Sequence, residues 1–197
     1  KIAEEWYQKM KQFNIKPDLT TFNSLIHGYC KIKNLERAEQ LFNEMIQLNI
    51  KPDNITYNTL LNGYISIEDF EKINQLFSKM NNEQILDIVT YNLIIKLWCK
   101  KRNMKKSEEI FGVIIKNNIK PDVITFNTLI DGYLNNNDIE KAEKLFIKMI
   151  QFKIEPNLTT FNIMIDRFCK LNQIEKAQEW FQKMKQFKIE PDVTTYS

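Results

Sequence analysis

Glycine and histidine are scarce in this chain of 197 residues, which has four glycines and a single histidine. The glycines are scattered, so the sequence contains no glycine-rich loop of the kind that binds phosphate groups. The histidine, His27, has no Cys or Ser partner in a recognisable catalytic order, and we interpret it as a polar surface residue. The sequence therefore gives no support to an enzyme, a cofactor or a small-molecule substrate.

Long apolar runs are also absent, because no run is long enough to cross a bilayer, and no signal peptide is visible. We therefore expect no membrane partner. Charged residues make up 27% of the chain and leave a net charge of +3. This mild basic excess permits a nucleic-acid partner without requiring one.

The prolines are few, but their spacing is regular. Successive prolines are 35, 69, 35 and 35 residues apart, at Pro17, Pro52, Pro121, Pro156 and Pro191. Repeats of about 35 residues are typical of solenoids, in which each repeat covers the apolar face of its neighbour. We therefore expect one extended domain built from stacked repeats.

Five complete repeats can be aligned on the prolines, at residues 19–53, 54–87, 88–122, 123–157 and 158–192. The second repeat is one residue short and ends in Gln84, Ile85, Leu86 and Asp87, with no proline. A partial repeat, residues 1–18, precedes the five, and residues 193–197 begin another. We therefore expect the chain to be a piece of a longer array.

Each repeat has two apolar stripes at helical spacing. In the first repeat they are Phe22, Leu25, Ile26, Tyr29 and Cys30, followed by Leu35, Ala38, Leu41, Phe42 and Met45. No alternating, strand-like pattern competes with them. The sequence thus predicts an all-α protein in which each repeat is a pair of antiparallel helices.

Capping residues agree with these helices. An acid or amide suited to the N-cap precedes the first helix of successive repeats, at Asp18, Asp53, Asp122, Asn157 and Asp192. Where second helices must end, the chain has Asn14, Asn49 and Asn118, and Asn tolerates the left-handed conformation that often ends a helix.

The three cysteines share one helical phase, each directly after an aromatic residue, at Cys30, Cys99 and Cys169. A metal site or a disulfide is the alternative, but no repeat supplies a second ligand. Because free cysteine is among the most buried residue types, we predict that all three fill the core.

Two rows of polar residues recur in phase and are not explained by core packing. The Asn row follows the first aromatic residue of each repeat, at Asn23, Asn58, Asn92, Asn127 and Asn162, with Ser197 in the final partial repeat. The acid row is the last residue of each repeat, at Asp18, Asp53, Asp87, Asp122, Asn157 and Asp192. Each row has a structural alternative, because the acid row could be N-caps only and recent duplication could account for the Asn row. Together, the two rows favour a binding surface.

Several segments resemble the pentatricopeptide repeat family. They are residues 21–31 (TFNSLIHGYCK), 38–45 (AEQLFNEM), 50–53 (IKPD) and 56–64 (TYNTLLNGY). The resemblance covers the whole chain and implies a right-handed α-solenoid superhelix of helix-turn-helix repeats. It also implies binding of single-stranded RNA, one base per repeat, with the N-terminal repeats toward the RNA 5′ end, in a mitochondrion or plastid.

In this family the Asn row and the acid row choose the base. The pairs carried over to this chain are Asn23 with Asp53, Asn58 with Asp87, Asn92 with Asp122, Asn127 with Asn157, and Asn162 with Asp192. The resemblance assigns uracil to Asn with Asp and cytosine to Asn with Asn. The implied target is pyrimidine-rich, with the core 5′-UUUCU-3′ and cytosine tolerated at the uracil sites. We expect the shortened turn before Asp87 to disturb the second pair.

Two further rows complete the site by resemblance. Residues implied to sandwich each base are Thr20, Ile55, Val89, Ile124, Thr159 and Thr194. Lysines implied to contact phosphates are Lys31, Lys100 and Lys170, which Ser66 and Asn135 replace in two repeats. The alternative function is a peptide-binding or assembly scaffold of the tetratricopeptide kind. That function would not explain why the acid row has Asn157 where the other repeats have Asp.

Overall fold

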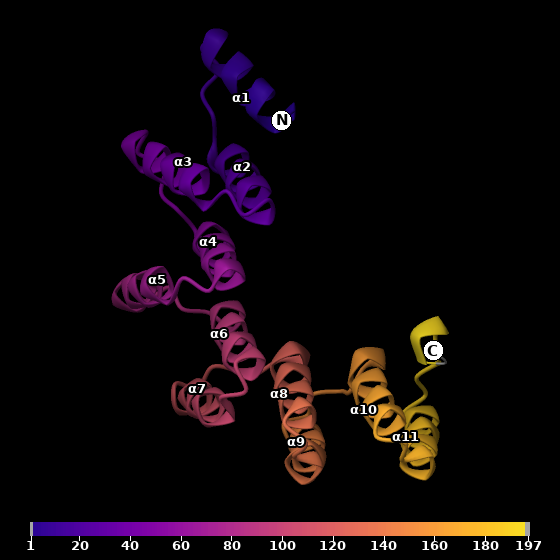
Figure 1. Ribbon diagram of the computed structural model, residues 1–197. Helices are drawn as coiled ribbons and strands as arrows, with labels where there is room; N and C mark the ends of the chain where they lie inside the picture. Colours follow the sequence, from indigo (N-terminus) through magenta and orange to yellow (C-terminus); the bar gives the residue numbers. More distant parts are fainter. Residues whose placement is uncertain (1, 196–197) are drawn as a thin grey trace. The chain divides into compact units, whose positions relative to one another are not determined.

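The computed structural model describes residues 2–195 of the chain. Regular structure in this range comprises eleven α-helices and a final 3-10 turn, η1 (Val193–Thr195), with no strand (Figure 1). The all-α prediction is confirmed. None of the helices in residues 2–195 has both the length and the apolar composition that a membrane-spanning segment needs.

The chain divides into two compact units, Lys1–Leu93 and Ile94–Ser197, with the division inside α6 (Ile88–Lys100). The other helices of the first unit are α1 (Ile2–Gln12), α2 (Leu19–Lys31), α3 (Leu35–Gln47), α4 (Asn54–Ile67) and α5 (Phe70–Asn82). Those of the second unit are α7 (Met104–Lys116), α8 (Val123–Asn135), α9 (Ile139–Gln151), α10 (Leu158–Lys170) and α11 (Ile174–Gln186).

The predicted N-caps are confirmed. Asp18, Asp53, Asp122 and Asn157 precede α2, α4, α8 and α10 and accept a hydrogen bond from the backbone N–H three residues later. The residue that donates is a threonine each time, so the same local motif begins each of these helices. Second helices are capped in the same way by Asn34, Asp69, Asn103 and Asp138. Satisfying these N–H groups fixes where each helix begins.

The turns between helices depend on residues with positive φ. Asn14, Asn49 and Asn118 have φ of 52°, 57° and 54°, so the prediction of left-handed helix ends is confirmed. The same conformation occurs at residues that the sequence analysis did not identify, including Lys33, Glu68 and Gln84. The left-handed helix end therefore also occurs at residues with no special preference for it.

The core lies between consecutive repeats. The aromatic residue that precedes each member of the Asn row is buried and packs edge-on against a ring from the second helix of the preceding repeat. Phe42 and Tyr57 have ring centroids 5.7 Å apart, and Phe146 and Phe161 are 5.6 Å apart. Because these rings are buried, the asparagine that follows each one is held at a defined place beside the next repeat.

The cysteine prediction is partly wrong. Cys30 is buried, and burial raises the pKa of its thiol to about 11, whereas Cys169 is exposed. Cys30 packs against Gly63 of the following repeat, where an added Cβ would lie 2.9 Å from the cysteine Sγ. Cys99 is partly buried.

Candidate functional site

The first amide–acid pair forms a closed hydrogen-bonded triangle with a threonine. Asn23 donates from Nδ2 to Asp53 Oδ1 at 3.2 Å, and the Thr56 hydroxyl donates to Asn23 Oδ1 at 2.6 Å. Thr56 also donates its backbone N–H to Asp53 Oδ1 at 2.9 Å. The capping motif of α4 thus holds an amide that lies in the preceding repeat.

The second pair repeats this arrangement. Asn58 Nδ2 donates to Asp87 Oδ1 at 3.1 Å, Thr90 Oγ1 donates to Asn58 Oδ1 at 2.7 Å, and Thr90 N donates to Asp87 Oδ1 at 2.8 Å. The expectation that the shortened turn would disturb this pair is wrong. Asp87 keeps its place because it accepts the N–H of Thr90, three residues later, and this local bond does not depend on the length of the turn before it.

The second unit contains two more triangles. Asn127 Nδ2 donates to Asn157 Oδ1 at 3.3 Å and Asn162 Nδ2 donates to Asp192 Oδ1 at 3.3 Å, with Thr160 and Thr195 as the bridging threonines. Of the remaining predicted pair, Asn92 lies in the first unit and is buried, whereas Asp122 lies in the second and caps α8. Ser197 and the side chain of Thr194 lie outside the described residues.

The capping bond decides which atom each acid-row residue turns away from the helix. Thr160 N–H and Asn127 Nδ2 both donate to Asn157 Oδ1, so the Asn157 amide must be oriented with Nδ2 outward. In Asp53 the same capping position is filled by Oδ1, and Oδ2 accepts no hydrogen bond from any described residue. The outward atom is therefore an acceptor at Asp53 and a donor at Asn157.

The acid row thus caps helices, as the structural alternative predicted, and it also contacts the Asn row. Asp18 shows the capping role alone, because it accepts from Thr21 and has no amide partner among the described residues. The triangles also explain the asparagines structurally, because each one ties two consecutive repeats together.

The carboxylates are held in their ionised form. Partial burial raises the pKa of Asp53, but hydrogen bonds from Thr56 and Asn23 outweigh it, and the net pKa lies below the usual value. The pKa of Asp87 is lowered by the same balance, with Asn54 as an additional donor. Near neutral pH both residues are therefore acceptors only.

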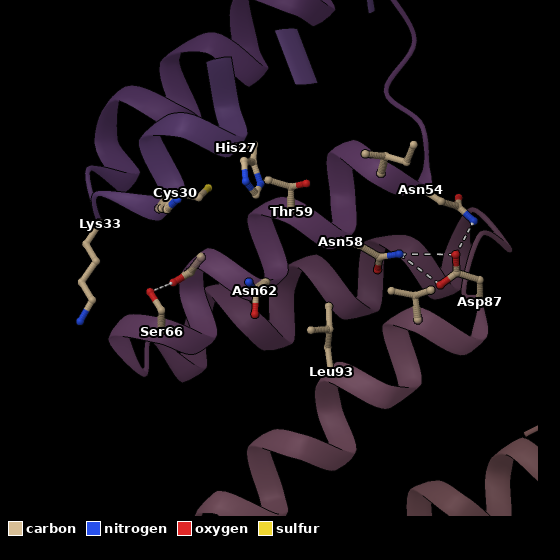
Figure 2. Close-up of a pocket in the computed structure, with 14 residues that line it drawn as sticks. His27, Cys30, Lys33, Asn54, Asn58, Thr59, Asn62, Ser66, Asp87 and Leu93 are labelled. Atoms are coloured by element: carbon tan, nitrogen blue, oxygen red, sulfur yellow. Dashed lines mark hydrogen bonds between the residues drawn. The ribbon is translucent and has the colours of Figure 1, made fainter. Parts of the chain in front are cut away.

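A groove of about 650 Å³ opens beside the second pair (Figure 2). Asn54, Asn58 and Asp87 lie toward one end of the groove, and Lys33 and Ser66 lie toward the other (Figure 2). The lining also includes the apolar residues Ile55, Val89 and Leu93 and the polar or basic residues His27, Lys31 and Asn62. An apolar wall, a hydrogen-bonding edge and a basic end are what a flat, polar-edged group carrying a negative charge requires.

The predicted sandwich residues are exposed apolar or small side chains. Ile55, Val89 and Ile124 have 64%, 49% and 57% of their surface exposed, and Ile55 and Val89 line the same groove. Thr20 and Thr159 are also exposed. The predicted phosphate lysines differ, because Lys31 forms no ion pair within residues 2–195, whereas Lys170 Nζ lies 2.7 Å from Asp166. Lys100 is exposed.

Two sets of site residues escaped the sequence analysis. The bridging threonines recur at a fixed phase, at Thr56, Thr90, Thr160 and Thr195, and this recurrence was visible in the sequence. Asn54 is polar where the first residue of the equivalent helices is apolar, which was also a visible signal. No group of three or more His, Cys, Asp or Glu side chains in residues 2–195 is arranged to bind a metal ion.

Comparisons with known proteins agree with this geometry. The model of the PPR repeat family matches residues 17–66, 86–133, 121–170 and 159–197, and the PPR repeat model matches residues 55–85. No curated protein matches the sequence.

Solved structures share the fold at low sequence identity. One is the pentatricopeptide repeat protein PPR10 in complex with an 18-nucleotide psaJ RNA element, with a TM-score of 0.81, 24% identity and 93% of this chain covered. Another is the structure of PPR10 from maize, with a TM-score of 0.69, also at 24% identity and with 93% of this chain covered. The chain spans about a quarter of PPR10, 27% and 26% of the two structures.

The PPR domain of the Arabidopsis thaliana protein-only RNase P 1, in complex with tRNA, has a TM-score of 0.64 at 13% identity. In that comparison 90% of this chain and 94% of the domain are covered. All three comparisons show the same solenoid of helix pairs.

Proposed function

The chain belongs to the pentatricopeptide repeat family, and we propose that it binds single-stranded RNA sequence-specifically, one base per repeat, with the core target 5′-UUUCU-3′. The repeats that contact the bases are residues 19–53, 54–87, 88–122, 123–157 and 158–192, within one array over residues 1–197. Asp18 and Ser197 belong to the partial sites at its two ends. A catalytic role is not part of the proposal.

The observation that carries the proposal is the change of the outward atom in the acid row. Uracil has a proton on N3, which an outward carboxylate oxygen such as Asp53 Oδ2 can accept. Cytosine N3 has no proton and needs a donor, which the outward Asn157 Nδ2 supplies. The capping bonds keep each outward atom in place before RNA arrives, so little side-chain entropy is lost on binding.

The amide of the Asn row supplies the second contact. Asn23 Nδ2 uses one hydrogen for Asp53 and retains another, which can be donated to a carbonyl oxygen of the pyrimidine. The same holds for Asn127 beside Asn157. Both pyrimidines have the O2 acceptor, so this contact accounts for a general preference for pyrimidines. The outward atom of the acid row accounts for the choice between uracil and cytosine.

The remaining rows supply contacts that do not depend on base identity. Exposed apolar side chains such as Ile55 and Val89 can cover the faces of an unstacked base. Lys31, which lines the groove, can bind a phosphate. The RNA and tRNA complexes of the structural relatives support a nucleic-acid partner.

A titration of labelled RNA against the purified chain tests the proposal. We expect RNA containing UUUCU to bind more tightly than an oligo-A of equal length at every salt concentration, with both affinities falling as salt rises. Equal affinity for the two RNAs, or no binding to either, would refute the proposal and favour a tetratricopeptide-like peptide or assembly scaffold.

Family membership extends the proposal to the role of binding. We propose that the RNA is an organellar transcript, in a mitochondrion or plastid, and that the chain acts in its processing, stability or translation. Crosslinking of the tagged full-length protein in cells, followed by RNA sequencing, tests this extension, and recovery of only nuclear or cytosolic transcripts would contradict it.

A further inference from the structure

The first residue of α4 is unlike its equivalents in the other repeats. Asn54 is polar, whereas the helices α2, α6, α8 and α10 begin with Leu19, Ile88, Val123 and Leu158. Asn54 is also the residue that comes directly after Asp53, so it lies at the edge of the groove beside Ile55. A polar side chain here is neither a cap nor a core residue, and its contacts indicate another role.

The Asn54 side chain contacts the outward oxygen of the second acid. Its Nδ2 donates to Asp87 Oδ2 at 3.1 Å, and Asn58 Nδ2 lies 3.4 Å from the same oxygen (Figure 2). Asp87 Oδ2 is therefore flanked by two amide nitrogens. Asp53 Oδ2, the equivalent atom in the first repeat, has no such neighbour in the described chain.

The hydrogens of these amides determine what the groove offers to a ligand. Each amide nitrogen carries two hydrogens, and each uses one of them for Asp87. A second hydrogen remains on Asn58 and on Asn54, and the carboxylate oxygen between them retains a lone pair. The edge therefore presents a donor, an acceptor and a donor in sequence.

This order matches one base. The pairing edge of uracil has the order acceptor, donor, acceptor, from O2, N3–H and O4. Cytosine has an acceptor at O2, an acceptor at N3 and a donor at N4, so it would meet the carboxylate and the Asn54 donor with groups of the wrong kind. Unpaired polar groups are costly when a site is desolvated, so a mismatch at two points discriminates more strongly than a mismatch at one.

We propose that Asn54 is a third specificity-determining residue, and that it makes the second base site, formed by Asn54, Ile55, Asn58, Asp87 and Val89, more selective for uracil over cytosine than the first. This inference rests on the proposed RNA binding and deepens it. The first site, with Leu19 in place of Asn54, tolerates cytosine.

The Asn54→Leu variant tests the inference, because leucine occupies the same position in two other repeats and should not disturb the fold. Affinities are measured for three RNAs that differ in one base, containing UUUCU, UCUCU or CUUCU. We expect the ratio of affinities for UUUCU and UCUCU to fall about fivefold in the variant, the factor for one neutral hydrogen bond. The ratio for UUUCU and CUUCU, which reports on the first site, should not change.

The reciprocal variant, Leu19→Asn, places an amide beside Asp53 and should increase discrimination at the first base by a similar factor. An unchanged ratio at the second base in Asn54→Leu, with UUUCU still bound, would overturn the inference and leave Asn54 as a support for the shortened turn. Failure of the unaltered chain to prefer UUUCU over oligo-A would instead refute the proposed function itself, so the two failures are distinguishable.

Discussion

The hydroxyl group of Thr56 donates a hydrogen bond to the side-chain carbonyl of Asn23, 33 residues earlier in the chain, at 2.6 Å. The two residues belong to consecutive repeats. Thr56 has no exposed surface, and its hydroxyl also contacts Asp53, so this one side chain ties a helix cap to the amide of the preceding repeat.

Replacing Thr56 with Val should therefore destabilise the chain. The change keeps the shape of the side chain but leaves Asn23 Oδ1 without its donor in a part-buried site, and we expect the free energy of unfolding to fall by about 1–3 kcal/mol. Urea denaturation followed by circular dichroism measures this.

Thr21→Val is the control, since Thr21 donates its N–H and hydroxyl to Asp18 as Thr56 does to Asp53, but has no amide partner from a preceding repeat among the described residues. Thr56 also accepts from the Asp53 N–H, a bond that Thr21 lacks. A control that loses as much stability as Thr56→Val would show that the inter-repeat bond contributes nothing.

Replacing glycine with alanine should change the stability of the chain in opposite directions at two glycines of the same helical phase. An added Cβ at Gly63 would lie 2.8 Å from Leu35 Cδ1 and 2.9 Å from Cys30 Sγ, whereas at Gly28 it would meet nothing within 4 Å. We expect Gly63→Ala to lower the free energy of unfolding by about 1–3 kcal/mol through overpacking. Gly28→Ala should raise it by up to about 1 kcal/mol through helix propensity. Thermal melts of both variants test this, and equal shifts would contradict it.

The base choice of the fourth repeat should follow residue 157. In Asn157→Asp the outward donor becomes an acceptor while the cap is retained, so preference at the fourth base should move from cytosine to uracil. Asp53→Asn is the converse change and should move the first base from uracil to cytosine. Selection from randomised RNA measures both, and unchanged base profiles would mean that the acid row only caps helices.

Asp53 should make stability depend on pH in the acid range. Its folded-state pKa lies below the ordinary value of 3.8, so the stabilisation is fully present above that pH and is lost as the pH falls through the folded pKa. We expect Asp53→Asn, which keeps a cap, to be less stable than the parent by under about 1 kcal/mol at pH 7. The difference should vanish at the lowest pH, and a difference independent of pH would contradict the prediction.

The salt dependence of RNA binding should depend on Lys31. With about three phosphates bound, the slope of log affinity against log salt should be near −2, and Lys31→Ala should reduce its magnitude by about 0.7. Lys170→Ala should change it less, because Asp166 already partly neutralises Lys170 in the free protein. A larger change for Lys170→Ala than for Lys31→Ala would be inconsistent with this assignment.

Much of the fold was predictable because it depends on residues close together in the sequence. The cap at Asp53 needs only a threonine three residues later, and the turn at Asn49 needs only a residue that accepts positive φ. The 35-residue period then predicts the order of helices. The Asn row and the acid row were found in the same way, because stacked repeats put equivalent positions on one surface.

The sequence by itself determined where helices begin and end, because caps and turns depend on neighbours three or four residues away. It also determined which polar residues share a phase, because the repeat period can be read along the chain. Only the tertiary structure decided that Asn23 joins Asp53, that Asn54 flanks the outward oxygen of Asp87, and that Cys30 is buried while Cys169 is exposed. Those relationships join residues about 30 positions apart, and they arise only when one repeat packs against the next.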